Sequence, residues 1–120
     1  ALINCINKYS NIKAIAHFNK PYFDLDMEEI IPYLIKKNIA LELNSRALEI
    51  DRKNWGNCKT IISNMESSGV KFIISSDAHS LQQLGDFESA IEFAKYCSLR
   101  EENIVNTSID KLKNYLSLDL

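Results

Sequence analysis

The sequence predicts an α/β fold built from parallel β-α units, because two kinds of pattern alternate along it. Short, β-rich apolar runs, the expected strands, lie at residues 12–16, 39–43, 70–75 and 103–105. The longer stretches between them carry apolar residues at i, i+3, i+4 and i+7, which is typical of amphipathic helices. Strands that alternate with helices pair in parallel, and near-continuous apolar strands indicate a sheet that helices cover.

Local signals mark the ends of the expected helices. Asp26 and Glu29 have the spacing of a capping box at a helix start, and Pro32 should kink that helix or shift its start. Gly69 is suited to end the next helix. Helical character is expected in the first nine residues, around residues 27–34, 58–65 and 87–94, and from about 108 to 116.

Composition places the chain among ordinary globular proteins. It has 120 residues, enough for one domain, and 14 basic against 16 acidic residues give a net charge of −2. This balance weakens any case for broad binding to nucleic acid, which needs clustered Lys and Arg. No apolar run approaches the ~18 residues of a membrane span, and no signal peptide is visible.

The three cysteines, Cys5, Cys58 and Cys97, predict neither disulfides nor a cysteine-rich zinc site. Their number is odd and no C-x-x-C spacing occurs. We expect each to act as a small buried hydrophobic residue. Unpaired cysteines favour a reducing, cytoplasmic setting.

Polar residues gather where the expected strands end. His17 follows the first strand, Arg46 follows the second, and Ser76, Asp77 and His79 follow the third. In parallel α/β folds, sites form at the carboxyl ends of strands, so these groups should share one rim. The chain has two histidines, and both lie at such positions.

These residue types suit metal and phosphate chemistry. Imidazole and carboxylate are ligands for Zn, Mn or Fe, and Asp77 and His79 are alternate residues that would point the same way in an extended segment. Arg46 and Lys20 could grip phosphate. Glu42 lies mid-strand, where it must be paired or face a polar interior, so we expect it to support a ligand rather than bind metal.

Structural readings of the same residues stay open. His17 could cap or be partly buried, Asp77 could turn its loop, and Arg46 could be a solvated charge. Nucleophile schemes are weaker, since the chain has no G-x-S-x-G elbow and no cysteine close to a histidine in sequence. The three isolated glycines exclude a glycine-rich phosphate loop.

Several segments resemble the PHP (polymerase and histidinol phosphatase) superfamily, and most closely its bacterial single-domain phosphatases. They are AIAHFNK, IALELNSRAL, VKFIISSDAHS, LGDFESAIEFA and ENIVN, in family order across residues 11–116. The resemblance implies a distorted (β/α)7, TIM-like barrel that hydrolyses phosphate esters with two or three Zn, Mn or Fe ions. It makes His17, Asp77 and His79 metal ligands and catalytic residues, with Asn44 lining the site or supporting a ligand. Phe18 replaces the family's usual proline.

The family's first-strand H-x-H motif and its later His and Glu ligands have no counterpart here. We therefore expect residues 1–120 to be the C-terminal portion of a PHP domain, cut from something longer, as the start at Ala1 also suggests. The intact parent would be a phosphatase acting on a phosphorylated small molecule. The chain alone should be inactive, or bind one metal weakly, without the N-terminal half of the barrel.

Two other functions remain open from the sequence. The chain could be a non-catalytic half-barrel that works as an assembly or binding module, pairing with its other half or forming a homo-oligomer through open strand edges. It could also belong to the PHP domain of a DNA polymerase, although the net charge of −2 does not favour that alternative.

Overall fold

A computed structural model describes residues 1–17 and 26–117. Its centre is a three-stranded parallel sheet in the order β1 (Ala14–Ile15), β2 (Ala40–Asn44), β3 (Phe72–Ser75). Leu41 pairs with Ile15 on one side and with Phe72 on the other. The α/β class and the parallel strands are confirmed; closure into a barrel stays a prediction.

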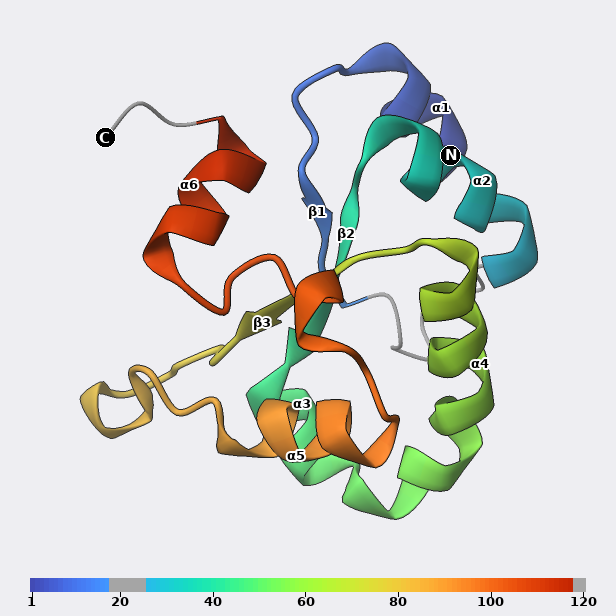
Figure 1. Cartoon of the computed structure of the whole chain (residues 1–120). Coiled ribbons are helices and arrows are strands. Elements are labelled where there is room, and N and C mark those ends of the chain that lie inside the picture. The colour runs from blue at the N-terminus through green and yellow to red at the C-terminus, as the bar shows by residue number, and fades with distance from the viewer. Residues whose placement is uncertain (18–25, 118–120) are drawn as a thin grey trace.

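Helices precede, link and follow the strands (Figure 1). Figure 1 shows α2 and α4 on one side of β2 and α6 on the other. The helices are α1 (Leu2–Lys8), α2 (Met27–Lys37), α3 (Ser45–Ile50), α4 (Trp55–Ser68), α5 (Glu88–Tyr96) and α6 (Ile109–Leu116). Single 3-10 turns occupy Arg52–Asn54, Leu81–Gln83 and Glu101–Asn103.

The predicted helix ends follow from local chemistry. The Asp26 carboxylate accepts hydrogen bonds from the N–H groups of Glu28 (3.1 Å) and Glu29 (3.2 Å), so α2 begins at Met27. Pro32 lies inside α2 and does not shift its start, although it cannot donate a helical hydrogen bond. Gly69 ends α4 with a φ of 104°, a conformation that favours glycine.

The core lies between the sheet and the helices. The strands contribute Leu41, Leu43 and Phe72, and the helices contribute Leu34, Met65, Phe93 and others, all almost fully buried. Side chains of this kind each contribute about 1.5–3 kcal/mol by leaving water. This core fixes β2 at the centre of the sheet and thereby fixes the carboxyl ends of all three strands.

The predicted fourth strand at residues 103–105 is wrong. Ile104 forms a single bridge with Phe72, and the Val105 N–H donates to the Phe72 carbonyl at 2.8 Å. One residue later, the Asn106 side chain pairs with β3 in place of the backbone. Its Oδ1 accepts from the Ile74 N–H (3.0 Å) and its Nδ2 donates to the Ile74 carbonyl (2.7 Å). An amide side chain thus occupies the position along β3 that a longer strand would need.

The cysteine prediction is partly wrong. Cys97 is buried, and burial raises the pKa of its thiol to about 11. Cys58 is half-buried, whereas Cys5 is exposed because it lies on the solvent face of α1. Across the described ranges, none of the helices combines the length and the hydropathy that crossing a membrane requires.

Candidate functional site

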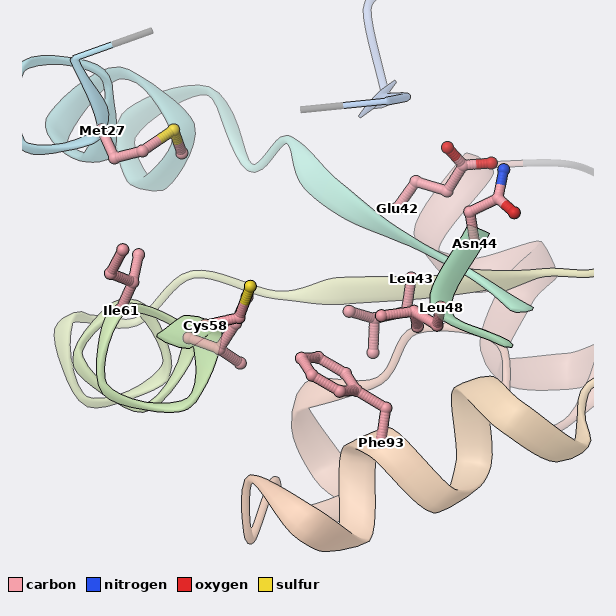
Figure 2. Close-up of a pocket in the computed structure, with 9 residues that line it drawn as sticks. Met27, Glu42, Leu43, Asn44, Leu48, Cys58, Ile61 and Phe93 are labelled. Atoms are coloured by element: carbon pink, nitrogen blue, oxygen red, sulfur yellow. The ribbon is translucent and has the colours of Figure 1, made fainter. Parts of the chain in front are cut away.

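Glu42 ties the ends of all three strands together. It and Asn44 project from one side of β2 while Leu43 projects from the other (Figure 2). The Glu42 side chain is 13% exposed. Its Oε2 accepts from the His17 N–H at 3.0 Å, and its Oε1 accepts from the Ser75 hydroxyl at 2.6 Å. The sequence-based expectation that this mid-strand carboxylate is paired is therefore met without any Lys or Arg partner among the described residues.

His17 lies just beyond β1, where the backbone takes a φ of +57°. Its Nδ1 is buried without a hydrogen-bond partner and faces Glu42 Oε2 at 4.0 Å. The side chain is nevertheless 44% exposed, so the exposed surface belongs to the rest of the ring, which includes the Nε2 edge. The Glu42 carboxylate holds the backbone N–H of His17, and the ring is partly exposed to solvent.

His79 is oriented in a similar way. Its Nδ1 lies 2.7 Å from the Asp77 carbonyl oxygen. Because a carbonyl can only accept, Nδ1 carries the proton of this hydrogen bond, and in the neutral ring Nε2 is then the nitrogen with the lone pair. The His79 N–H donates to Gln83 Oε1 at 2.7 Å, which holds the loop in place.

Arg46 lies against the ring of His79. One guanidinium nitrogen is 3.2 Å from Nδ1 and 3.1 Å from Nε2. Since it is almost equidistant from both, it cannot lie in line with either lone pair and must sit over the ring face. Arg46 forms no ion pair with a carboxylate in the part of the chain that the structure describes.

Asp77 lies between these groups, also with a positive φ, 51°. The adjacent Asn44 side chain is the main cause that lowers the pKa of the Asp77 carboxyl below its ordinary 3.8. The charges of His79, His17 and Arg46 act in the same direction, and desolvation opposes them. The Asp77 side chain is therefore a carboxylate at neutral pH, and His79, His17 and Arg46 all favour its charged form.

Asn44 is 3% exposed and serves two neighbours. Its Oδ1 accepts from the Ala47 N–H at 2.9 Å and caps α3. Its Nδ2 is buried and forms no hydrogen bond of normal geometry, so it acts on Asp77 as a nearby dipole. The resemblance suggested that Asn44 would line the site or support a ligand; its role as a helix cap was missed because no helix was expected at Ser45–Ile50.

The donors fit a divalent metal in their chemistry and partly in their arrangement. His79 directs Nδ1 to an oxygen at hydrogen-bond distance, the orientation found when the other ring nitrogen binds metal, whereas His17 Nδ1 lies 4.0 Å from Glu42 and forms no hydrogen bond. Over residues 1–17 and 26–117, however, no three His, Cys, Asp or Glu side chains converge to hold an ion. Metal binding by His17, Asp77 and His79 therefore stays a prediction.

The remaining predicted site residues have different outcomes. Ser76 is half-buried and lines a small polar cleft with Arg46, Gln83 and Asp86. Lys20 and Phe18 lie outside the described residues. The pairing of Ser75 with Glu42 was not predicted, because no pattern of residue types indicates which side chains meet across two strands.

A cavity of about 180 Å³ adjoins β2 near the site (Figure 2). Glu42 and Asn44 stand at one end, and the rest of the lining is apolar, from Met27 of α2, Ile61 of α4 and Phe93 of α5 among others. Apolar walls cannot compensate the desolvation of a phosphate group. The polar rim at the strand ends is therefore the better candidate site for an anionic ligand.

Comparison with known proteins gives a consistent set of relatives. No family model matches the chain. The chain is 29% identical over 117 residues to a probable phosphatase of Clostridium acetobutylicum, covering 97% of this chain and 48% of that protein. It is 31% identical over 118 residues to one of Shewanella piezotolerans, covering 98% and 47%. A probable phosphatase of Thermoanaerobacter pseudethanolicus is 32% identical over 118 residues, with 97% and 47% covered.

The chain therefore spans about half the length of the curated relatives it matches. The match includes nearly all of this chain, so it covers all three strands and the residues that follow them.

Proposed function

We propose that this chain forms part of a metal-dependent phosphatase of the PHP kind, which hydrolyses phosphate esters of small molecules. One observation carries the proposal: His17, Asp77 and His79 follow two strands of one sheet, with the His17 backbone held by Glu42 and His79 Nδ1 held by the Asp77 carbonyl. The similarity of nearly the whole chain to probable phosphatases supports the same chemistry.

Each donor has a distinct task in this proposal. His17 and His79 would hold a Zn, Mn or Fe ion through Nε2, and Asp77 through its carboxylate. A bound ion would supply an activated water and neutralise phosphate oxygens. Glu42 holds His17 in place, and the Asp77 carbonyl fixes the protonation of the His79 ring.

Arg46 would bind the phosphate itself. It is a fixed cation at the rim with no carboxylate partner among the described residues, so its guanidinium keeps free donors. A planar guanidinium matches two phosphate oxygens at once. Ser76, beside Arg46 in the polar cleft, would add a hydroxyl donor.

The donors in this chain are too few for a polynuclear centre, so further ligands would have to come from residues outside these 120. In the relatives, about half of the protein lies outside the match. We expect the chain by itself to bind one divalent ion weakly and to show little turnover.

A chimera tests the function. In the Thermoanaerobacter pseudethanolicus relative, the matched 118 residues would be replaced by this chain. The chimera should hydrolyse 4-nitrophenyl phosphate with Mn²⁺, and Asp77→Asn should abolish turnover while preserving its fold. A folded chimera without turnover would contradict the proposal. Strong turnover by the 120-residue chain alone, lost in Asp77→Ala, would contradict the expectation that the chain is incomplete.

Assembly is a second candidate function, favoured by β1. Among the described strands, β1 pairs on one side only, with β2, so its other edge could accept a strand from another chain. Light scattering at several concentrations tests this role. A monomer throughout would contradict self-assembly.

A further inference from the structure

His17, which follows β1, and Asp77, which follows β3, both have a backbone with positive φ. Five described residues other than glycine have positive φ. Asn38, Ser98 and Ser117 immediately follow or end helices, where this conformation is common. The other two are His17 and Asp77, with φ of 57° and 51°. A left-handed backbone costs free energy in such residues and persists only where surrounding contacts hold it.

We propose that β2 is a positioning element: Glu42 and Asn44, two residues apart on one face of this strand, hold His17 and Asp77 in the conformations that present their side chains at the rim. The proposal takes from the proposed function only the identity of His17 and Asp77 as ligands. Neither Glu42 nor Asn44 contacts substrate in it, and each acts through its neighbour.

Glu42 acts on the backbone of His17. The pairing of β1 with β2 ends at Ile15 and Leu41, so the sheet itself no longer holds the chain at residue 17. The Glu42 carboxylate replaces that support by accepting from the His17 N–H at 3.0 Å. The Ser75 hydroxyl at 2.6 Å fixes the carboxylate from the side of β3. The position of His17 thereby depends on β2 and β3 together.

Asn44 acts on the side chain of Asp77. Its Oδ1 is committed to the Ala47 N–H, and its Nδ2 is buried without a hydrogen-bond partner. Asn44 pairs with Ser75 in the sheet, two residues before Asp77, so this amide lies beside the segment that carries the Asp77 carboxyl. The Asn44 side chain therefore caps α3 and, in this proposal, also positions the Asp77 carboxylate that follows β3.

Two pairs of variants of the whole 120-residue chain separate positioning from general stability. Glu42→Gln keeps the side-chain volume and one acceptor, whereas Glu42→Ala removes both acceptors. Exposed Glu49 of α3 provides the control, because Glu49→Ala makes the same change in charge. Asn44→Ser keeps an oxygen to cap α3 but lacks the amide nitrogen, whereas Asn44→Ala lacks both.

Nuclear magnetic resonance of the metal-free chain gives the readout. In Glu42→Ala we expect the His17 amide to exchange at least about tenfold faster relative to the β3 amides, with a smaller effect in Glu42→Gln and none in Glu49→Ala. In Asn44→Ser, the three-bond couplings of Asp77 should change from one χ1 rotamer to an average, while α3 amides stay protected. A purely structural role would instead speed exchange across β2, β3 and His17 alike, and would leave the Asp77 rotamer unchanged in Asn44→Ser; either result overturns the proposal.

Mn²⁺ binding keeps this proposal distinct from the proposed function. If both hold, Glu42→Ala and Asn44→Ser should each weaken Mn²⁺ binding about tenfold, the effect typical of residues that orient metal ligands. A wild-type chain that binds no Mn²⁺ would contradict the metal site, while the amide exchange and the couplings would still decide whether β2 positions His17 and Asp77.

Discussion

Replacing Asn106 with alanine should destabilise the fold although Asn106 lies at the edge of the sheet. The substitution removes two hydrogen bonds, at 3.0 and 2.7 Å, and leaves the N–H and the carbonyl of Ile74 without their partner. A hydrogen bond contributes about 1 kcal/mol net, and an unsatisfied buried group costs about 1–3 kcal/mol. Ile74 is half-buried, so water compensates part of this loss and we expect about 2 kcal/mol.

Urea unfolding followed by circular dichroism measures this loss, and Asn114→Ala on the exposed face of α6 is the control. The control should differ from wild type by about 0.5 kcal/mol or less, on the stabilising side, because alanine favours helix. Asn106→Asp adds a second test, since the introduced carboxylate can accept from the Ile74 N–H but repels the Ile74 carbonyl. A change below about 0.5 kcal/mol in Asn106→Ala would refute the view that this amide replaces a strand.

Three further outcomes follow from the site and the core. Arg46→Gln should weaken binding of inorganic phosphate about tenfold, and Arg46→Lys should weaken it less. Phosphorus-31 nuclear magnetic resonance measures this affinity, and equal affinities of wild type and Arg46→Gln would exclude a phosphate contact. The pKa of Cys97 is about 11, so only roughly 1 in 1,000 of its thiol groups is ionised at pH 8. Iodoacetamide should therefore label exposed Cys5 first. Rapid labelling of Cys97 in the native protein would show that it is not buried. The pKa of Asp77 is lowered in the folded chain, so its ionisation stabilises the fold at pH values above its ordinary pKa of 3.8. This contribution is lost as the pH falls through the lowered pKa of the folded chain, so Asp77→Asn should lose less free energy of unfolding in acid than wild type. Parallel curves of unfolding free energy against pH would argue against the shift.

The strands and helices were predictable where their patterns are local. Apolar runs located β2 and β3 within two residues at either end, and the Asp26 cap set the start of α2. The run at 103–105 pairs with β3 only through the bridge of Ile104 to Phe72, because the Asn106 side chain occupies the next position along β3. Apolar character shows that a segment is buried; whether it pairs depends on a side chain outside the run.

The candidate site was predictable as a set of residues and not as a geometry. Parallel topology indicated that His17, Asp77 and His79 would follow strand ends. His and Asp adopt a positive φ more readily than most residues other than glycine, but residue type alone does not show at which positions they do so. Their conformation depends on contacts from β2 that are distant in sequence, such as the hydrogen bond from the His17 N–H to Glu42.

Titrating the chain with Mn²⁺ while recording the histidine ring protons tests the metal site most directly. The chain has two histidines, so their ring signals can be assigned by substituting either one. We predict that Mn²⁺ broadens the ring signals of His17 and His79 together, before the signals of exposed carboxylates elsewhere, and that Asp77→Ala removes this selectivity. Equal broadening across the surface, or selective broadening that persists in Asp77→Ala, would contradict a metal site at these strand ends.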